Sequence, residues 1–93
     1  MSISPVDLDL AWDIHPQVSV RPEPFGALLY HFGTRKLSFL KDLTLLAIVR
    51  ALAESTSARE ACVAAGVADS DVERYRQALD TLVRSSMLVE RTP

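Results

Sequence analysis

The side chains that could do chemistry are few in this chain, and their spacing favours neither catalysis nor metal binding. His15 and His31 are the two histidines, and neither has a cysteine or a pair of carboxylates nearby at the spacing of a metal site. Cys62 is the one cysteine and lies in the small apolar run ACVAA, which is typical of a packing residue without a base partner. We therefore predict that the chain is not an enzyme and uses no cofactor or metal.

The carboxylates and glycines have structural explanations. Asp42, Asp69 and Asp71 stand where helices are expected to start, and the helix dipole favours negative charge there. The three glycines lie apart from one another, so the sequence has no glycine-rich phosphate loop. These residues indicate helix boundaries and turns rather than a reactive site.

Composition narrows the class of partner. The formal net charge is -2 and the pI is near 5.6, whereas a duplex-binding domain usually carries a basic surplus. No apolar stretch approaches the roughly 20 residues that span a bilayer, and the N-terminal MSISPVDLDL is acidic where a signal peptide is basic. The 93 residues thus predict one small soluble cytoplasmic protein, with no nucleic acid and no membrane as partner.

The run from Arg21 to Lys41 predicts a hairpin that leads directly into a helix. In FGALLYHFGTRKLSFL, Gly33 and Thr34 are expected to form a two-residue turn, with Gly33 supplying the positive φ. The resulting register pairs Phe32 with Arg35, Tyr30 with Leu37, and Leu28 with Phe39.

The two faces of this hairpin differ in composition. Five of the six residues just paired are large and apolar, and all six share one face. A register slip of one residue would mix the two faces, so this separation supports the pairing. We expect His31 on the outward face of the hairpin. That second, more mixed face carries Leu29, His31, Lys36, Ser38 and Leu40.

The segments around the hairpin carry weaker strand signals. Val18 and Val20 alternate with polar residues and predict a first strand, which the prolines of Pro22-Glu23-Pro24 are expected to break. Before it, Trp12 and the alternating leucines predict a short strand or an extended arm packed by Trp12. Near the C-terminus, the apolar run 87–89 predicts a last short strand or a segment packed on the sheet.

Three helices are predicted after the hairpin. The first spans about Asp42 to Glu54, with Asp42 as its cap. The second starts at Ser57, which with the glutamate three residues on fits a capping box, and ends near Gly66. The third starts at Ser70 with a second box and runs to about residue 86. The apolar stripes are Leu45, Ile48, Val49 and Leu52 in the first helix, and Val72, Tyr75, Leu79, Leu82 and Val83 in the third.

The predicted fold is α+β, a three-stranded antiparallel sheet followed by three helices. A short turn containing Gly66 joins the last two helices, which gives the helical part a helix-turn-helix geometry. We divide the chain into an N-terminal lead-in, residues 1–16, and a main domain, residues 17–93.

The third strand is the expected point of interest, because it lies at the edge of the sheet. Its amides and carbonyls can pair with an incoming extended chain, which is recognition by β-augmentation. Leu37 and Phe39, together with third-helix residues, could line a groove beside it, although at least half of this set is expected to be core. The flanking basic residues are either a solvated rim that blunts the edge or an attraction for an acidic peptide; they are Arg21, Arg35, Lys36 and Lys41.

The segment HPQVSVRPEPFGALLYHFGTRKLSFLK carries a specific resemblance, and the match extends from about His15 to Glu90. The chain resembles the small peptide chaperones of mycofactocin biosynthesis, relatives of the chaperone in pyrroloquinoline quinone biosynthesis. Both belong to the recognition elements for ribosomally made, post-translationally modified peptides (RiPP recognition elements). The helical part, with ALAE and AAGV, agrees but is generic. The resemblance implies a winged helix-turn-helix-like fold and no catalysis.

The resemblance also implies a mechanism. The chain would hold the leader of a precursor peptide as an added strand along the third strand and against the third helix, and deliver it to a radical S-adenosylmethionine (SAM) maturase. A single cysteine cannot hold the iron–sulfur cluster of such chemistry, so that cluster belongs to the maturase. By position, the leader-contacting candidates are Arg35, Lys36, Leu37, Ser38, Phe39, Leu40, Tyr75, Leu79, Leu82 and Val83.

Two other interpretations remain. In a winged helix-turn-helix DNA-binding regulator the third helix would enter the groove, but its exposed side carries three residues of each sign, which suits a phosphate-lined groove poorly. In a homodimeric adaptor the free sheet edge would pair with a second copy. The charged third-helix residues are Arg74, Arg76 and Arg84 against Asp71, Glu73 and Asp80.

Overall fold

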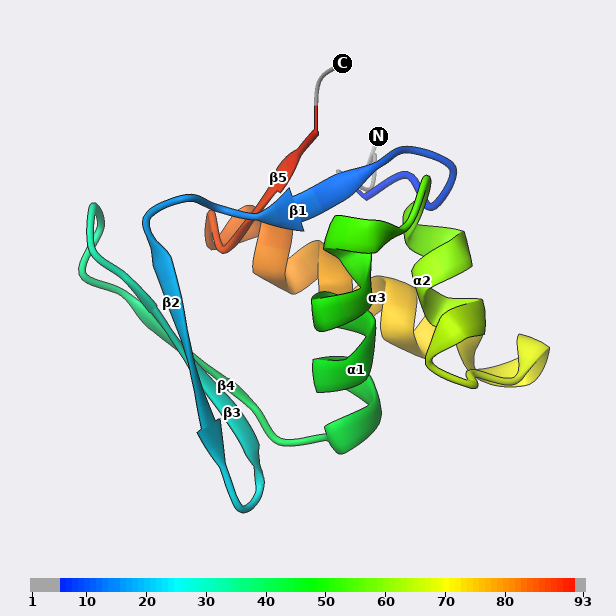
Figure 1. Cartoon of the computed structure of the whole chain (residues 1–93), viewed down its shortest axis with the longest axis horizontal. Helices are drawn as coiled ribbons and strands as arrows, with labels where there is room; N and C mark the ends of the chain where they lie inside the picture. The colour runs from blue at the N-terminus through cyan, green and yellow to red at the C-terminus, as the bar shows by residue number, and fades with distance from the viewer. Residues whose placement is uncertain (1–5, 92–93) are drawn as a thin grey trace.

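The computed structural model describes residues 6–91, while residues 1–5 and 92–93 of the predicted lead-in and domain lie outside the described residues. A three-stranded sheet lies on one side of the molecule and the helices on the other, as Figure 1 shows. The prediction of an α+β fold with a three-stranded antiparallel sheet and three helices is confirmed.

The chain order is a short strand, a three-stranded meander, three helices and a last short strand. The meander runs in the order β2-β3-β4, and a separate two-stranded sheet pairs β1 with β5. The strands are β1 Trp12–Ile14, β2 Val18–Glu23, β3 Gly26–His31, β4 Leu37–Leu40 and β5 Leu88–Glu90. The helices are α1 Leu43–Ala51, α2 Ala58–Ala64 and α3 Val72–Arg84, with 3-10 turns η1 Leu52–Glu54 and η2 Asp69–Asp71.

The predicted hairpin register is confirmed for two of its three pairs, Tyr30 with Leu37 and Leu28 with Phe39. Phe32 and Arg35 lie in the connection and do not belong to the ladder. The predicted two-residue turn is wrong. The carbonyl of His31 accepts from the amide of Arg35, so the chain reverses over a longer loop. The positive φ falls on Arg35, at 62°, and Gly33 is not among the positive-φ glycines of the described chain.

The two hairpin faces also lie opposite to expectation. His31 was placed on the outward face, but it is 3% exposed, and its face packs on the helices with Leu29 and Leu40. The face with more large apolar residues is the solvent-facing one, where Leu37 and Phe39 are more than half exposed. The small Ala27 is fully buried on the helix side, so the covered face is chosen by close fit rather than by apolar bulk.

Pro22 does not break the first strand of the meander, contrary to prediction, because β2 continues through it to Glu23. Strand β2 lies at the sheet edge, where the missing amide of a proline can face outward without loss of a ladder bond. The chain turns instead at Pro24 and Phe25. Gly26 follows with φ 148°, and a Cβ on it would lie 2.0 Å from the carbonyl oxygen of Leu40.

The first two helices start as predicted. The Asp42 carboxylate accepts from the amides of Thr44 and Leu45 at the start of α1. The predicted single helix to Glu54 ends earlier, at Ala51, and continues as a 3-10 turn. Ser57 caps α2 by accepting from the amide of Glu60. The Glu60 carboxylate bonds to Thr56 rather than to the amide of Ser57, so only half of the capping box forms.

The end of α2 is as predicted, and the start of α3 is not. Gly66 has φ 82°, and the amide of Val67 bonds back to the carbonyl of Cys62, which is a Schellman ending. The predicted capping box at Ser70 is wrong, because residues 69–71 form a 3-10 turn and α3 begins without a side-chain cap. The carboxylate of Glu73 pairs instead with Arg76.

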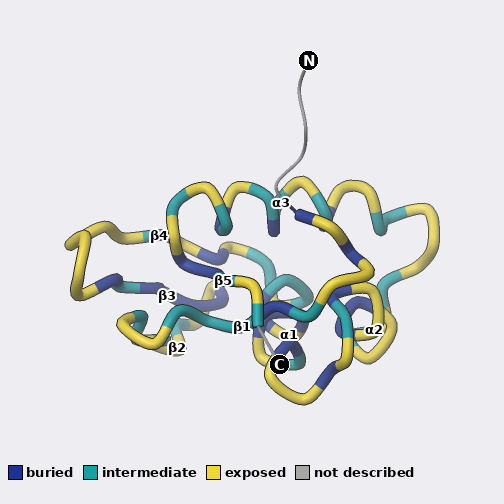
Figure 2. Tube along the Cα trace, turned by 90° about the horizontal axis from the view of Figure 1, so that it is seen from above, coloured by how far each residue is buried: buried dark blue, intermediate teal, exposed yellow. Residues whose placement is uncertain are grey.

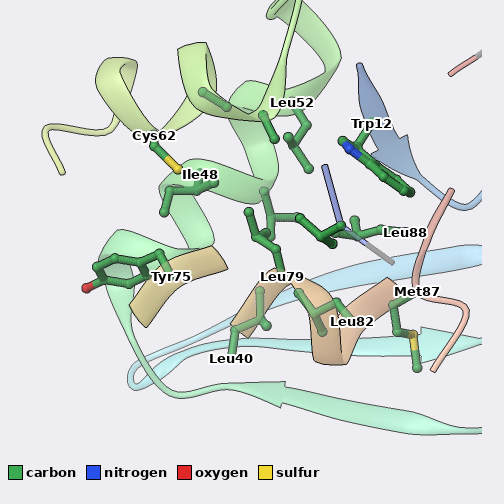
Figure 3. Close-up of a cluster of buried hydrophobic side chains, with 14 of the residues drawn as sticks. Trp12, Leu40, Ile48, Leu52, Cys62, Tyr75, Leu79, Leu82, Met87 and Leu88 are labelled. Carbon is green, nitrogen blue, oxygen red and sulfur yellow. The ribbon is translucent and has the colours of Figure 1, made fainter. Parts of the chain in front are cut away.

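The described part of the lead-in joins the core. Strand β1 pairs antiparallel with β5, in the register Trp12 to Glu90. Trp12 is buried among the same residues as the helices, and its indole donates to the carbonyl of Asp7 at 2.9 Å. Two residues of the run 87–89 therefore do form a strand, β5 Leu88–Glu90, but it pairs with β1 and not with the meander. Figure 3 shows Trp12, Met87 and Leu88 in one core with residues of the helices.

Candidate functional site

Among residues 6–91, strand β4 presents a free edge, because it pairs with β3 on one side alone. The amide of His31 donates to the carbonyl of Lys36, and this pair sets the phase of the ladder. Hydrogen-bonded and non-bonded pairs alternate in an antiparallel ladder, so Ser38 and Leu40 point their amides at β3. The amides and carbonyls of Leu37 and Phe39 are therefore directed to the open edge.

The other edge of the same sheet is a poorer template. By the same alternation, Val18, Val20 and Pro22 face outward on β2. The amide of Val18 already donates to the carbonyl of His15 at 2.9 Å, and Pro22 has no amide. Strand β2 thus keeps one outward backbone amide that can donate to a new strand, whereas β4 has two. An incoming extended chain has a longer uninterrupted ladder to join at β4.

A groove of about 380 Å³ lies along the free edge, between β4 and α3. Figure 2 shows this arrangement from above, with β4 the strand of the meander nearest to α3. The bottom of the groove is apolar. The side formed by α3 is shallow because two of the lining residues on α3 have small side chains. The lining residues are Ser38, Phe39 and Leu40 of β4, Leu45 of α1, and Ala78, Thr81 and Leu82 of α3.

The structure brings together some of the candidate residues predicted from sequence and separates others. Ser38, Phe39, Leu40 and Leu82 line the groove, and Leu37 contributes the adjoining edge. Arg35 and Lys36 are exposed in the loop before β4. The other α3 candidates are Tyr75 and Leu79, which are buried in the core, and Val83, which is half-buried against it. Figure 3 labels Tyr75 and Leu79 in that core.

Ala78 and Thr81 are groove residues that the sequence reasoning missed. They lie outside the apolar stripe of α3, because neither is a large apolar residue. Their positions could have been found from the helical spacing: Ala78 and Thr81 are three residues apart and each adjoins a buried leucine of the stripe. Small side chains at such positions leave room for a ligand.

A hydrogen bond joins α3 to the junction between β4 and α1. The hydroxyl of Tyr75, on α3, donates to the carboxylate of Asp42 at 2.7 Å, and Asp42 comes two residues after β4. This bond, together with the amides of Thr44 and Leu45, holds the pKa of Asp42 below its usual range. A charge-assisted contact therefore links α3 to the segment that follows β4.

The basic residues divide into paired and unpaired groups. On α3, Arg76 pairs with Glu73 and Arg84 with Asp80, while the Arg74 guanidinium lies 4.9 Å from the ring centroid of Tyr75. No ion pair is recorded within residues 6–91 for the exposed cations at the two ends of β4. Those cations are Arg35, Lys36 and Lys41.

The described residues show no arrangement for catalysis. Cys62 is buried, and burial raises the pKa of its thiol, which disfavours the thiolate. Within residues 6–91, no three side chains of His, Cys, Asp or Glu gather as metal ligands. No helix in that part of the chain has both the length and the apolar character to cross a membrane. What the site offers is backbone hydrogen bonding beside an apolar groove.

Comparisons with known proteins agree with a binding module. Residues 11–89 match the model of the Peptide chaperone MftB family. The chain is 60% identical to the peptide chaperone MftB of Mycobacterium tuberculosis over 88 residues, which cover 95% of this chain and 81% of that protein. It is 63% identical to the protein of the same name from Mycobacterium ulcerans, over 89% of this chain and 76% of the relative.

A third relative is the peptide chaperone MftB of Mycolicibacterium smegmatis, 59% identical over 94% of this chain and 85% of its own length. No solved structure matches the chain significantly. The family match covers the hairpin, the groove and all three helices, so the resemblance seen in the hairpin segment is confirmed over most of the chain. The chain therefore belongs to the Peptide chaperone MftB family, the non-catalytic peptide chaperones of mycofactocin biosynthesis.

Proposed function

We propose that this chain binds the leader of a precursor peptide as an added antiparallel or parallel strand along β4, with leader side chains in the groove under α3. The observation that carries the proposal is the coincidence of a free ladder edge at Leu37 and Phe39 with an apolar groove beside it. Backbone pairing supplies affinity, and the groove supplies specificity through alternate side chains.

The energetics suit reversible binding. Each new backbone hydrogen bond stabilises the complex by a net of about 0.5–1.5 kcal/mol. The entropy lost when a flexible leader becomes ordered offsets the contribution of several such bonds. Apolar side chains of the leader, buried against Leu40, Leu45 and Leu82, must therefore supply much of the remaining affinity. We expect leader segments with apolar residues at alternate positions to bind best.

Charge assists the encounter. Arg35 and Lys36 lie exposed where β4 begins, and carboxylates on a leader would complement them. Exposed charges of this kind raise the association rate more than the final affinity. A peptide with acidic residues flanking its apolar strand is therefore the ligand class that this edge fits.

In this proposal the chain then delivers the precursor to a radical SAM maturase that carries out the chemistry. Holding the leader converts the encounter between precursor and enzyme into an intramolecular one, with a raised effective concentration. A second copy of the chain could pair through the same β4 edge, and such a homodimer would compete with the leader for it.

Isothermal titration calorimetry with synthetic precursor, full-length and without its leader, tests the proposal. We expect binding of the full-length peptide and loss of that binding when the leader is removed. Binding that persists without the leader would place recognition in the rest of the precursor. An absence of binding to both peptides would refute leader recognition by the free chain.

A further inference from the structure

The solvent-facing side of the meander carries a cluster of large apolar side chains, most of which lie outside the groove beside α3. Phe25 and Phe39 lie with ring centroids 6.2 Å apart, and Tyr30 and Phe32 make an edge-to-face contact at 5.0 Å. We call this surface the outer face: Phe25, Leu28, Tyr30, Phe32, Leu37, Phe39 and Lys41. The helices pack on the opposite side of the sheet, so none of them covers it.

A hollow of about 320 Å³ opens on the outer face, lined by Phe25, Phe39 and Lys41. Its lining is mostly apolar, with Lys41 as the one charged lining residue. Exposed apolar surface of this kind, rimmed by polar residues, marks an interaction site in soluble domains. Aromatic residues are enriched at the centres of protein interfaces, where they carry much of the binding energy.

The charges around the outer face indicate what it binds. On β2, Arg21 is already paired with Glu23 at 3.2 Å. The remaining cations on this face are Arg35 at one end of β4 and Lys41 at the other, both exposed. Two copies of the chain stacked on this face would bring like charges together, which opposes self-association. A partner surface with an apolar patch bordered by carboxylates would fit it.

The outer face and the groove meet at Phe39, which borders both hollows. A leader strand added to β4 would extend the sheet sideways and leave the outer face open. The chain can therefore hold a leader at the edge and a second protein on the face at the same time, as a delivery protein must.

We propose that the outer face is the surface on which the maturase docks, through an apolar patch bordered by carboxylates, while the leader occupies the groove. This inference rests on the proposed function, because it takes the maturase as the partner. The docking surface is new: Phe25 is its apolar anchor and Lys41 its charged contact. Neither residue lines the groove.

The test measures two affinities for each variant, one for the precursor peptide by calorimetry and one for the maturase by biolayer interferometry. The double variant Phe25→Ser, Lys41→Glu alters the outer face and spares the groove. Phe25 is 43% exposed, so its loss costs little of the core. The matched control is Val63→Ser, which removes an apolar side chain that is 71% exposed on α2, away from the sheet.

We expect the double variant to lose about tenfold or more in affinity for the maturase, the effect of one interface anchor. Measured at high salt, where the charge change at Lys41 is screened, its affinity for the precursor should stay within about twofold of the original, and the control should retain both affinities. Unchanged maturase binding in the double variant would overturn the docking proposal and leave leader recognition standing. Loss of precursor binding in the double variant would also overturn it, by assigning the outer face to the peptide.

Two results distinguish the remaining cases. If the unaltered chain binds the leader but not the maturase, the delivery half of the proposed function fails together with this inference. If sedimentation shows a dimer that the double variant abolishes, the occupant of the outer face is a second copy, and the maturase proposal is wrong.

Discussion

Asp42 combines two tasks at the residue scale. Its carboxylate caps α1 through the amides of Thr44 and Leu45, and it accepts the hydroxyl of Tyr75 from α3. The sequence predicted the first task, because an aspartate before an apolar helical stripe is a common cap. It could not predict the second, since the partner lies 33 residues away and the bond depends on how α3 packs.

The lowered pKa of Asp42 predicts a dependence of stability on pH. The folded chain holds the carboxylate ionised to lower pH than the unfolded chain does, chiefly through the Tyr75 hydroxyl. The stabilisation is complete above the unfolded pKa of about 3.9 and is lost as the pH falls through the lower folded pKa. We expect Asp42→Asn, which keeps the cap, to flatten the loss of stability below about pH 4. Urea unfolding between pH 3 and 7 measures this, and a loss of stability as steep as in the unaltered chain would contradict it.

Gly26 and Gly66 form a matched pair for a second prediction. Both have a positive φ, but a Cβ on Gly26 would lie 2.0 Å from the Leu40 carbonyl oxygen, whereas nothing lies within 4 Å of one on Gly66. Gly66→Ala should cost the conformational strain alone, about 1–3 kcal/mol. Gly26→Ala should cost more and should also disturb β4. Equal free energies of unfolding for the two variants would show that the contact with Leu40 relaxes without cost.

At the scale of elements, the sequence identified the hairpin register but not the face that is covered. Alternation shows which residues share a face, and both faces of this hairpin carry leucines. The helices cover the face of Ala27, Leu29 and Leu40, where a small residue admits α1 and no bulky aromatic intrudes. The expectation that the face with the larger apolar side chains is buried fails here. In our proposal that face stays exposed because it binds a partner.

The edge of β4 gives a prediction for a backbone change. Leu37→Pro removes an amide that points to the open edge, so the ladder to β3 should survive while leader binding falls by about tenfold or more. Val20→Pro makes the same change at an outward position of β2 and should leave leader binding intact. Circular dichroism checks that both variants fold, and calorimetry measures binding. A folded Leu37→Pro variant that still binds the leader would place the leader elsewhere.

The wall of the groove on α3 gives a prediction for a side-chain change. Thr81 is exposed and lines the groove, so Thr81→Trp should fill it and weaken leader binding without loss of stability. Val63→Trp places the same bulk on exposed α2 and serves as the control. The two variants should have similar thermal midpoints and different leader affinities. Equal affinities would show that the groove is not occupied by the leader.

At the scale of the whole molecule, strands β1 and β5, near the two ends of the described chain, complete the core that supports the groove. Strands β1 and β5 pair across the core, a contact between distant segments that no local pattern revealed. The guanidinium of Arg91 donates to backbone carbonyls of Trp12, Leu52 and Ser55. It thus joins β1, the 3-10 turn η1 and the residue that follows β5 in one network.

Removal of this network should loosen the whole domain. Arg91→Met keeps part of the apolar stem and removes the guanidinium donors, and hydrogen bonds to charged groups are worth about 1.5–3 kcal/mol each. Because the site is exposed in part, we expect a loss of stability at the lower end of that range, measured by urea unfolding. Leader affinity at a temperature where the variant is folded should stay unchanged. A variant as stable as the unaltered chain would show that water replaces these bonds at no cost.

The charge distribution over the molecule predicts the salt dependence of leader binding. Lys36→Glu places a carboxylate at the entry to β4 and should weaken binding by about fivefold at low salt, with a smaller salt dependence than the unaltered chain. Arg50→Glu makes the same change at an exposed position of α1 and should alter leader binding much less. Calorimetry across a salt series measures both variants. Identical salt dependence for all three proteins would remove the electrostatic part of the proposal.

The central claim is that the leader becomes a strand of the sheet at β4. Amide hydrogen exchange of Leu37 and Phe39, followed by nuclear magnetic resonance, tests it most directly, because these amides are the outward donors of that edge. We expect their exchange to slow when full-length precursor is added and to stay unchanged with the leaderless peptide, while the outward amide of Val20 is unaffected by either. Fast exchange at Leu37 and Phe39 in a chain saturated with precursor would contradict strand addition at β4.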